Sequence, residues 1–179
     1  MVLGIDRLLK LVKTKKLVEN LSPRELKNPE GAGFDLRLGK VHKITGKGFL
    51  GSYERNSADS KLIASFDKDK KRSIIIKPGE SYLVTTLEKI NLPQNLTANI
   101  WMRSTLYRSG MMMSGGNIAP GYQGQLSFLF YNAGKAKMEI ELGARIVHVI
   151  FWQVGGRTNI YRGQWQGGRV SANKKERQV

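Results

Sequence analysis

The sequence has no cysteine and only two histidines among its 179 residues. Disulfide bonds and thiolate metal sites are therefore excluded. An isolated histidine lacks the partners that a metal ion needs, so we expect no metal-ligating residues. No apolar run approaches the length of a membrane span, and no secretory signal is visible. We therefore expect a cytoplasmic protein that makes no contact with membranes.

Negative charge is also scarce, because only 14 acidic residues stand against 30 lysines and arginines. The resulting net charge of +16 favours polyanionic partners such as phosphates or nucleic acid. A lysine-rich surface suited to a hot or salty cell would have the same composition. Charge governs association and not fold, so both interpretations stay open at this point.

The chain is organised as one β domain with a short helix before it and a basic tail after it. Apolar residues recur at helical spacing within residues 5–18, which predicts an amphipathic helix. From Gly33 onward, short alternating segments are separated by turn residues, a pattern typical of a β-barrel or jelly roll. We expect the β domain to span 1–154 and a flexible, basic tail to span 155–179. The expected strands are 34–38, 41–44, 74–76, 82–86, 97–102, 125–131, 138–142 and 145–153, with a loop or hairpin arm at 46–61.

The segment Arg103-Ser104-Thr105 has the side chains that a phosphate group needs. A guanidinium offers paired, charge-assisted donors to phosphate oxygens, and hydroxyls and turn amides add further donors. Arg108 follows five residues later and would add a second cation or position a reacting base. Alone, the same residues would also fit an ordinary surface turn.

Two further segments have residues that fit a nucleoside. Asn117-Ile118 offers main-chain groups that can pair with a pyrimidine edge, and the hairpin 120–124 presents Tyr122. In the tail, Tyr161 to Gln166 mixes aromatic residues and glycine, and Trp165 could stack on a base. The alternatives are that Tyr122 packs on its own sheet and that the tail is a disordered basic segment.

These segments occur in one order along the chain and together resemble the dCTP deaminase/dUTPase superfamily. The N-terminal helix, Thr86-Leu87-Glu88 and the tail are more similar to the dCTP deaminase branch. The full series is Ala32-Gly33-Phe34-Asp35-Leu36, Lys77-Pro78-Gly79-Glu80, Thr86-Leu87-Glu88, Leu92-Pro93, Arg103-Ser104-Thr105-Leu106, Pro120-Gly121-Tyr122-Gln123-Gly124, Tyr131-Asn132 and Gly143-Ala144-Arg145-Ile146.

The resemblance implies a mainly β subunit, a distorted barrel or jelly roll of the dUTPase-like type with a short N-terminal helix. It also implies a homotrimer with active sites between subunits, and Mg²⁺ accompanying the bound nucleotide. In the family pattern, Tyr122 would pack under the deoxyribose. Ser104 and Arg108 would be remnants of the catalytic site. Tyr161, Trp165 and Gln166 would close the tail over the ligand.

Two positions depart from the family pattern where a catalytic carboxylate is expected. Ala119 stands where the dUTPase branch has an aspartate, and Leu129 stands where the deaminase branch has a glutamate. Deamination needs a group that takes a proton from water and returns it to the leaving ammonia, and neither side chain can do so.

Three hypotheses on function follow. The first is a protein that binds a deoxypyrimidine nucleoside triphosphate, dCTP or dUTP, with weak or lost catalysis. The second is a working enzyme of nucleotide metabolism, completed by a carboxylate from elsewhere. It would deaminate dCTP or act as a hydrolase on dUTP with Mg²⁺. The third is a basic module on the same barrel that binds nucleic acid or a protein partner.

Overall fold

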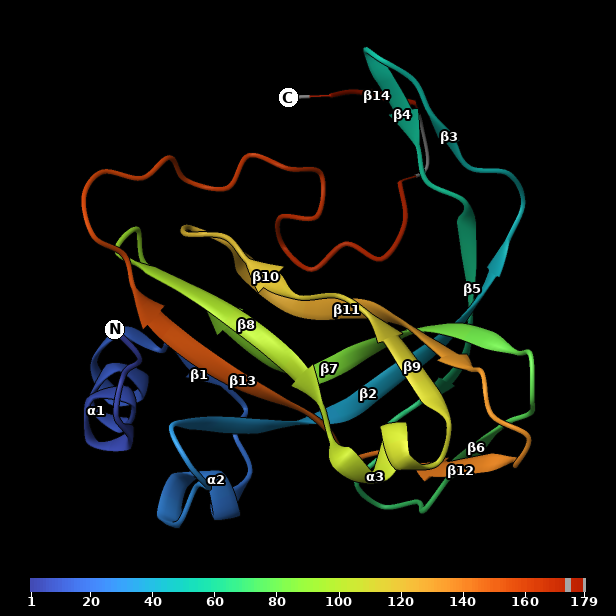
Figure 1. Ribbon diagram of the computed structural model, residues 1–179, viewed down its shortest axis with the longest axis horizontal. Coiled ribbons are helices and arrows are strands. Elements are labelled where there is room, and N and C mark those ends of the chain that lie inside the picture. The colour runs from blue at the N-terminus through green and yellow to red at the C-terminus, as the bar shows by residue number, and fades with distance from the viewer. Residues whose placement is uncertain (173–174, 179) are drawn as a thin grey trace.

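The structure of the protein, a computed structural model described for residues 1–172 and 175–178, is mainly β with short helices (Figure 1). The prediction of a β-barrel-like subunit with a short N-terminal helix is confirmed. The helices are α1 (Ile5–Lys15), α2 (Pro23–Lys27) and α3 (Ser104–Arg108). The strands are β1 (Val18–Glu19), β2 (Gly33–Thr45), β3 (Phe49–Leu50), β4 (Glu54–Asn56), β5 (Asp59–Ser65), β6 (Ser73–Ile76), β7 (Ser81–Asn91), β8 (Leu96–Met102), β9 (Met111–Ser114), β10 (Asn117–Ile118), β11 (Gln123–Asn132), β12 (Met138–Glu141), β13 (Arg145–Gln153) and β14 (Glu176–Arg177).

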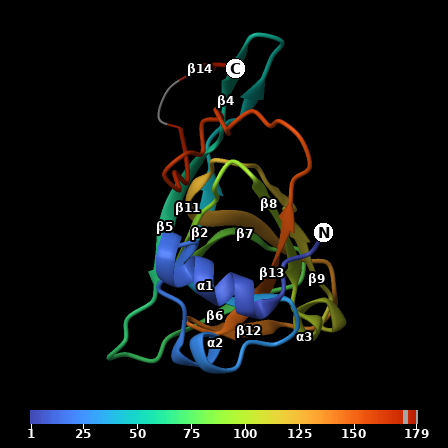
Figure 2. The same ribbon diagram turned by 90° about the vertical axis from the view of Figure 1, so that its left-hand side faces the viewer.

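The main sheet joins β10, β8, β13, β2, β7, β11 and β9 in that order, with β1 added to β7 and β5 added to β2. It curls into a half-barrel around the core (Figures 1 and 2). Residues of β11 alternate between buried and exposed because successive side chains of a strand point to opposite faces. Irregular register in β2 and β11 marks bulges, which increase the curl.

The core lies inside this curl and is closed at one end by α1 (Figure 2). Phe34 and Phe151 are fully buried and pack edge to face, with ring centroids 6.2 Å apart. Leu8 of α1 is buried with them, as the apolar spacing predicted. The helix ends earlier than the predicted 18, because Lys16 adopts a left-handed conformation with φ 51°. Among the described residues, no helix is long and apolar enough to cross a membrane.

The segment expected to be a loop or hairpin arm is a hairpin that projects from the body (Figure 1). Strands β3 and β4 form the hairpin, and β14 near the C-terminus pairs with the outer edge of β4. The predicted division between a domain at 1–154 and a tail at 155–179 stays a prediction. Residues 173, 174 and 179 of that tail lie outside the described residues.

The buried carboxylate of Asp35 on β2 binds side chains from three other parts of the chain. Arg103 and Arg145 both donate to its Oδ2, Arg145 at 2.8 Å, and His148 Nδ1 lies 2.9 Å from Oδ1. Arg24 of α2 approaches the same Oδ2 at 3.5 Å. Burial alone would raise the pKa of Asp35, but His148 and Arg103 together lower it to about 2. The network therefore joins α2, β2, β13 and the start of α3.

Two buried glutamates support the same region. Glu25 accepts a hydrogen bond from the main-chain N–H of Asp35 at 2.9 Å and is paired with Arg24. Glu88 on β7 accepts from both the Nε of Arg37, at 2.6 Å, and its main-chain N–H, at 2.8 Å. Buried charges of this kind are tolerated because each is paired and hydrogen-bonded.

We expect the substitution Asp35→Asn to destabilise the fold by about 3 kcal/mol. This is the low end of the range for a broken buried pair, because the guanidiniums can still reach water. Urea unfolding at pH 7 measures the effect. Glu30→Gln is the matched control, because Glu30 is exposed and touches Arg24 only at 3.3 Å. An equal loss in both variants would contradict a central role for Asp35.

The same carboxylate predicts a pH dependence. Its folded pKa of about 2 lies below its ordinary value of 3.8, so the charged form is favoured in the folded state. The stabilisation is therefore fully present above pH about 4 and is lost as the pH falls toward about 2. Unfolding free energies measured across this window should fall more steeply for the wild type than for Asp35→Asn.

Candidate functional site

A cavity of about 590 Å³ lies between the tail and the sheet, and it collects most residues predicted to contact a nucleoside. Asn117 and Ile118 of β10 line it, as do Tyr122 of the following hairpin and Tyr161 and Trp165 of the tail. These residues come from two stretches of chain, 117–122 and 161–165, that are 39 positions apart at their nearest residues. The structure therefore brings together the two predicted nucleoside-binding segments.

The cavity wall is apolar and hydroxyl-bearing, and it contains no carboxylate among the described residues that line it. Arg169 is its one fully charged lining residue. Such a wall can hold a planar ring and pair with its edge, but it offers no strong proton acceptor. The apolar lining side chains are Ile44, Leu83, Ile100, Leu126, Phe128 and Leu129, and the hydroxyls are those of Ser57, Ser60, Ser114 and Ser127.

Both positions that depart from the family pattern line this cavity. Ala119 follows β10, and Leu129 lies on β11 opposite Leu83 of β7 and Ser114 of β9. The two departures from the family pattern therefore lie in the cavity itself.

Tyr122 packs on its own chain while lining the cavity. Its hydroxyl donates to the main-chain oxygen of Gln125 at 2.6 Å, and its ring lies edge to face with that of Tyr161, with centroids 5.4 Å apart. Burial, with a smaller contribution from Tyr161, raises the pKa of Tyr122 to about 12. The phenol therefore stays neutral and serves as a fixed wall, which agrees with the alternative of packing on its own sheet.

The tail lies along the hairpin through main-chain and side-chain hydrogen bonds. Tyr161 N–H donates to Pro120 O at 2.7 Å. The side chain of Gln166 accepts from the N–H of Gln123 and donates to Gly121 O, each at 3.0 Å. The close approach depends on glycine. A Cβ added at Gly124 would lie 2.3 Å from the nitrogen of Gly168. Tail and hairpin thus form one wall.

The predicted phosphate-binding segment lies elsewhere. Ile118 pairs with Ala98 on β8, and Arg103 follows Ala98 by five residues of extended chain, which places it about 17 Å further along. The side chain of Arg103 is bound to Asp35, whereas Ser104 and Arg108 are exposed on α3. One chain therefore does not bring the predicted phosphate and nucleoside residues together.

A second cavity of about 580 Å³ adjoins the first and contains a residue that sequence reasoning treated as isolated. His42 lines it, and its Nε2 is buried with no hydrogen-bond partner among the described residues. Burial, with help from Lys40, lowers the pKa of His42. The sequence does not predict that His42 faces a cavity. The register shifts between Val41 and His42, and this bulge changes which side chains of the strand share a face.

The described residues do not form a preformed metal site, since no three His, Asp or Glu side chains gather among them. An Mg²⁺ ion would therefore have to be bound with the phosphates of a ligand rather than by a cage of protein acids.

Comparison with known proteins identifies relatives for most of the chain. A family model described as dCTP deaminase-like matches residues 2–154. The chain is 32% identical over 168 residues to the dCTP deaminase of Pyrococcus furiosus, which covers 93% of this chain and 95% of the relative. It is 31% identical over 130 residues to the Methanosphaera stadtmanae protein named dCTP deaminase, dUMP-forming, covering 70% and 66% of the two chains.

Solved structures show the same fold. The 2′-deoxycytidine 5′-triphosphate deaminase from Agrobacterium tumefaciens matches with a TM-score of 0.64 at 16% identity. The match covers 84% of this chain and 48% of that chain, so this chain spans about half its length. A mutant dUTPase from phage phi11 of S. aureus, studied for its structural Mg(II) ion, matches with a TM-score of 0.50 at 13% identity, covering 83% and 93%. The predicted dUTPase-like fold is confirmed.

The Gly124–Gly168 contact gives a direct test of how the tail is held. We expect Gly124→Ala to push the tail off the hairpin, because the new methyl group would overlap the main chain of Gly168. Tryptic cleavage after Arg162 and Arg169 should then become faster, and the fluorescence of Trp165 should shift toward that of an exposed indole.

Gly116→Ala is the matched control, because Gly116 lines the same cavity and a Cβ there would meet nothing within 4 Å. Equal cleavage rates in Gly124→Ala and the wild type would show that this contact does not hold the tail.

Proposed function

The chain belongs to the dCTP deaminase-like family, and from this membership we propose that it binds a deoxypyrimidine nucleoside triphosphate, dCTP or dUTP, with weak or lost catalysis. The observation that carries the proposal is the cavity of about 590 Å³, where predicted nucleoside residues from β10, the hairpin and the tail share one wall. Its place would be in cytoplasmic nucleotide metabolism, as a protein that senses or sequesters its ligand.

The geometry supports recognition of a flat, polar-edged ring. The Thr97 hydroxyl lies 2.9 Å from Asn117 Oδ1 and 2.8 Å from Ile118 O, so it fixes the groups that would read the base edge. Trp165 and Tyr122 supply aromatic walls on the tail and hairpin sides. Edge pairing of this kind discriminates because an unmatched buried polar group is costly.

The same wall argues against efficient chemistry. Deamination adds water to the base, moves a proton from that water to an acceptor and returns it to the leaving ammonia. Leu129 and Ala119 cannot hold the proton at any stage, and no carboxylate replaces them among the described lining residues. The relatives are named dCTP deaminase and dCTP deaminase, dUMP-forming. An active enzyme remains the alternative, and it would need an acid from another copy.

A homotrimer would complete the site, since none of the predicted phosphate-binding residues Arg103, Ser104 and Arg108 lines the cavity of its own chain. In a closed ring, α3 of one copy can face the cavity of the next. A row of uncharged side chains crosses neighbouring strands and lines the two cavities: Leu62, His42, Leu83, Leu129 and Ser114. In a chain with 44 charged residues (30 basic and 14 acidic), an uncharged sheet face indicates a covered one. Mg²⁺ would enter with the triphosphate.

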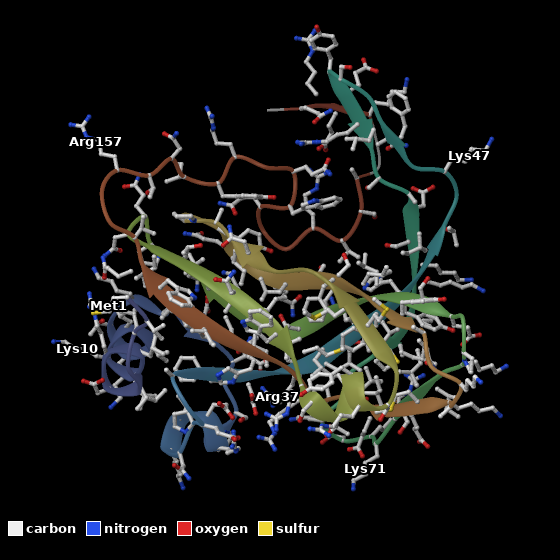
Figure 3. The ribbon with its side chains drawn as sticks, in the orientation of Figure 1. Met1, Lys10, Arg37, Lys47, Lys71 and Arg157 are labelled. Carbon is white, nitrogen blue, oxygen red and sulfur yellow. The ribbon has the colours of Figure 1, made fainter. Side chains whose placement is uncertain are left out.

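Nucleotide binding and turnover test the proposal together. We expect dCTP or dUTP with Mg²⁺ to raise the melting temperature, and Ser104→Ala and Arg108→Ala each to weaken binding about tenfold through lost charge-assisted contacts. Arg157→Ala is the matched control, because Arg157 is exposed and points away from the body (Figure 3). Ribonucleotides should bind less well than deoxynucleotides.

Turnover is expected about 10²- to 10⁴-fold below that of an ordinary enzyme, since general acid–base catalysis contributes that factor. Ammonia and pyrophosphate release measure it. Leu129→Glu should raise ammonia release, whereas Leu129→Gln, of the same size but without a proton-accepting carboxylate, should not. Wild-type turnover at ordinary rates would overturn the proposed loss of catalysis and leave the binding proposal standing.

Complementation between copies tests the composite site. We expect a solution mass of three times the 20.1 kDa subunit. Arg108→Glu should remove the phosphate contact, and Ala119→Trp should fill the nucleoside cavity. Neither variant alone should bind nucleotide. In randomly mixed trimers, about a quarter of the sites combine an intact phosphate contact from one copy with an intact cavity from the next, so co-expression should restore binding at those sites. No restoration, or a monomeric mass, would contradict the shared site.

A further inference from the structure

The arm formed by β3 and β4 exposes large apolar side chains that the core does not use. Phe49 is 53% exposed, Leu50 78% and Tyr53 83%. The arm stands away from the barrel (Figure 1), so these side chains do not cover any part of the core. A projecting cluster of exposed apolar side chains marks an interaction surface more often than a packing defect.

Positive charge surrounds these rings. Lys47 precedes Phe49 by two residues and points into solvent (Figure 3), and the ammonium group of Lys175 lies 5.7 Å from the Phe49 ring centroid. Arg55 follows Tyr53 by two residues, and its Nε is buried without a hydrogen-bond partner among the described residues. Arg177 of β14 pairs with Glu54 in the strand register and lies on the same arm.

The acidic residues of the arm are already engaged. Glu54 lies 3.7 Å from Lys175, and Glu176 accepts from Arg169 at 2.7 Å. Lys47, Arg55 and Arg177 take part in no ion pair among the described residues. The arm therefore carries two exposed aromatic side chains and three cations that form no ion pair among the described residues, on a chain whose net charge is +16. Arg55 and Arg177 lie opposite Glu176 and Glu54 in the strand register, so the cations outnumber the acids of the arm without being remote from them.

From this arrangement we propose that the arm binds single-stranded nucleic acid. Bases stack on Phe49 and Tyr53, and the neighbouring phosphates contact Lys47, Arg55 and Arg177. Stacking requires bases whose faces are free, so a single strand fits and a duplex does not. This site is separate from the nucleotide cavity, and it gives the basic surface a defined partner.

The arm is built to present its tip in a fixed position. The N–H of Gln178 donates to Tyr53 O at 2.9 Å, and the N–H of Ala172 donates to Ser57 Oγ at 3.1 Å. The C-terminal residues thus brace the hairpin as a third strand. A two-stranded hairpin alone is marginal in water, whereas three strands hold their shape.

Charge favours this partner over two others. A second copy of the arm would bring like charges together, which opposes self-association. An anionic membrane would attract the same cations, but Leu50 is the only aliphatic side chain among the three exposed ones, so little apolar area would enter the bilayer. Both alternatives are outcomes of the test.

Fluorescence anisotropy with a labelled oligo(dT) of about 20 nucleotides tests the site at about 50 mM salt. Tyr53→Ala and Phe49→Ala should each weaken binding about 5- to 150-fold, the effect of one lost base stack, while Tyr53→Phe retains affinity. Because these changes leave the charge unaltered, the loss cannot come from general attraction. Arg177→Gln should reduce the slope of log K against the logarithm of the salt concentration by about one, which corresponds to one lost phosphate contact.

Ile75→Ala is the matched control, since Ile75 is a half-exposed apolar residue on β6, and it should bind as the wild type does. Equal affinity of Tyr53→Ala and wild type would overturn the proposal, as would equal affinity for the duplex. Tyr53-dependent binding to phosphatidylserine vesicles without oligo(dT) binding would assign the arm to membranes. A Tyr53-dependent change in solution mass would assign it to self-association.

The nucleotide proposal and the arm proposal fail separately. Thermal shifts with dCTP and dUTP should be the same in Tyr53→Ala and the wild type, because Tyr53 does not line the cavity. Loss of oligo(dT) binding with retained nucleotide response therefore concerns the arm alone. Retained oligo(dT) binding without any thermal shift from dCTP or dUTP would support the arm site and contradict the proposed function of the cavity.

Discussion

The cations that converge on the buried carboxylate of Asp35 hold four parts of the chain together: α2, β2, β13 and the start of α3. Arg103 reaches that carboxylate at the start of α3, so the N-cap residue of this helix is held by an ion pair across 68 positions of sequence. Arg145 and His148 bind the same group from β13. An arginine that the sequence predicts as a phosphate ligand thus has a structural contact with Asp35.

Holding a base and transferring a proton need different kinds of side chain in this cavity. Hydroxyls, an oriented amide and aromatic walls need no ionisable group to bind a base. Proton transfer does need one, and Leu129 and Ala119 occupy the two places where the family pattern has it. Under the proposed function, these two positions allow a base to be bound without that proton transfer. Replacing a buried charge by an apolar side chain also removes a desolvation cost, which makes such a change easy to tolerate.

Sequence patterns predicted the long strands of the main sheet because one face of the sheet is buried and alternation records it, as in β11. They missed α2 and α3, each of five residues, because so short a helix shows barely one turn of periodicity. They also missed strand β9, in which Met111 is buried and Met112 exposed. The cavity residues were predicted one by one. Their grouping, and the pairing of Arg103 with Asp35, depend on long-range contacts that no local pattern contains.

The pairing of β14 with β4 has a consequence for solution behaviour. The free edge of a short strand offers unpaired N–H and C=O groups to any other extended chain, and β4 would present such an edge beside an exposed aromatic tip. The residues near the C-terminus occupy that edge in the chain's own structure (Figure 1). They therefore protect the edge of β4 from pairing with another chain. Proteolytic loss of a few terminal residues would expose this edge and promote aggregation.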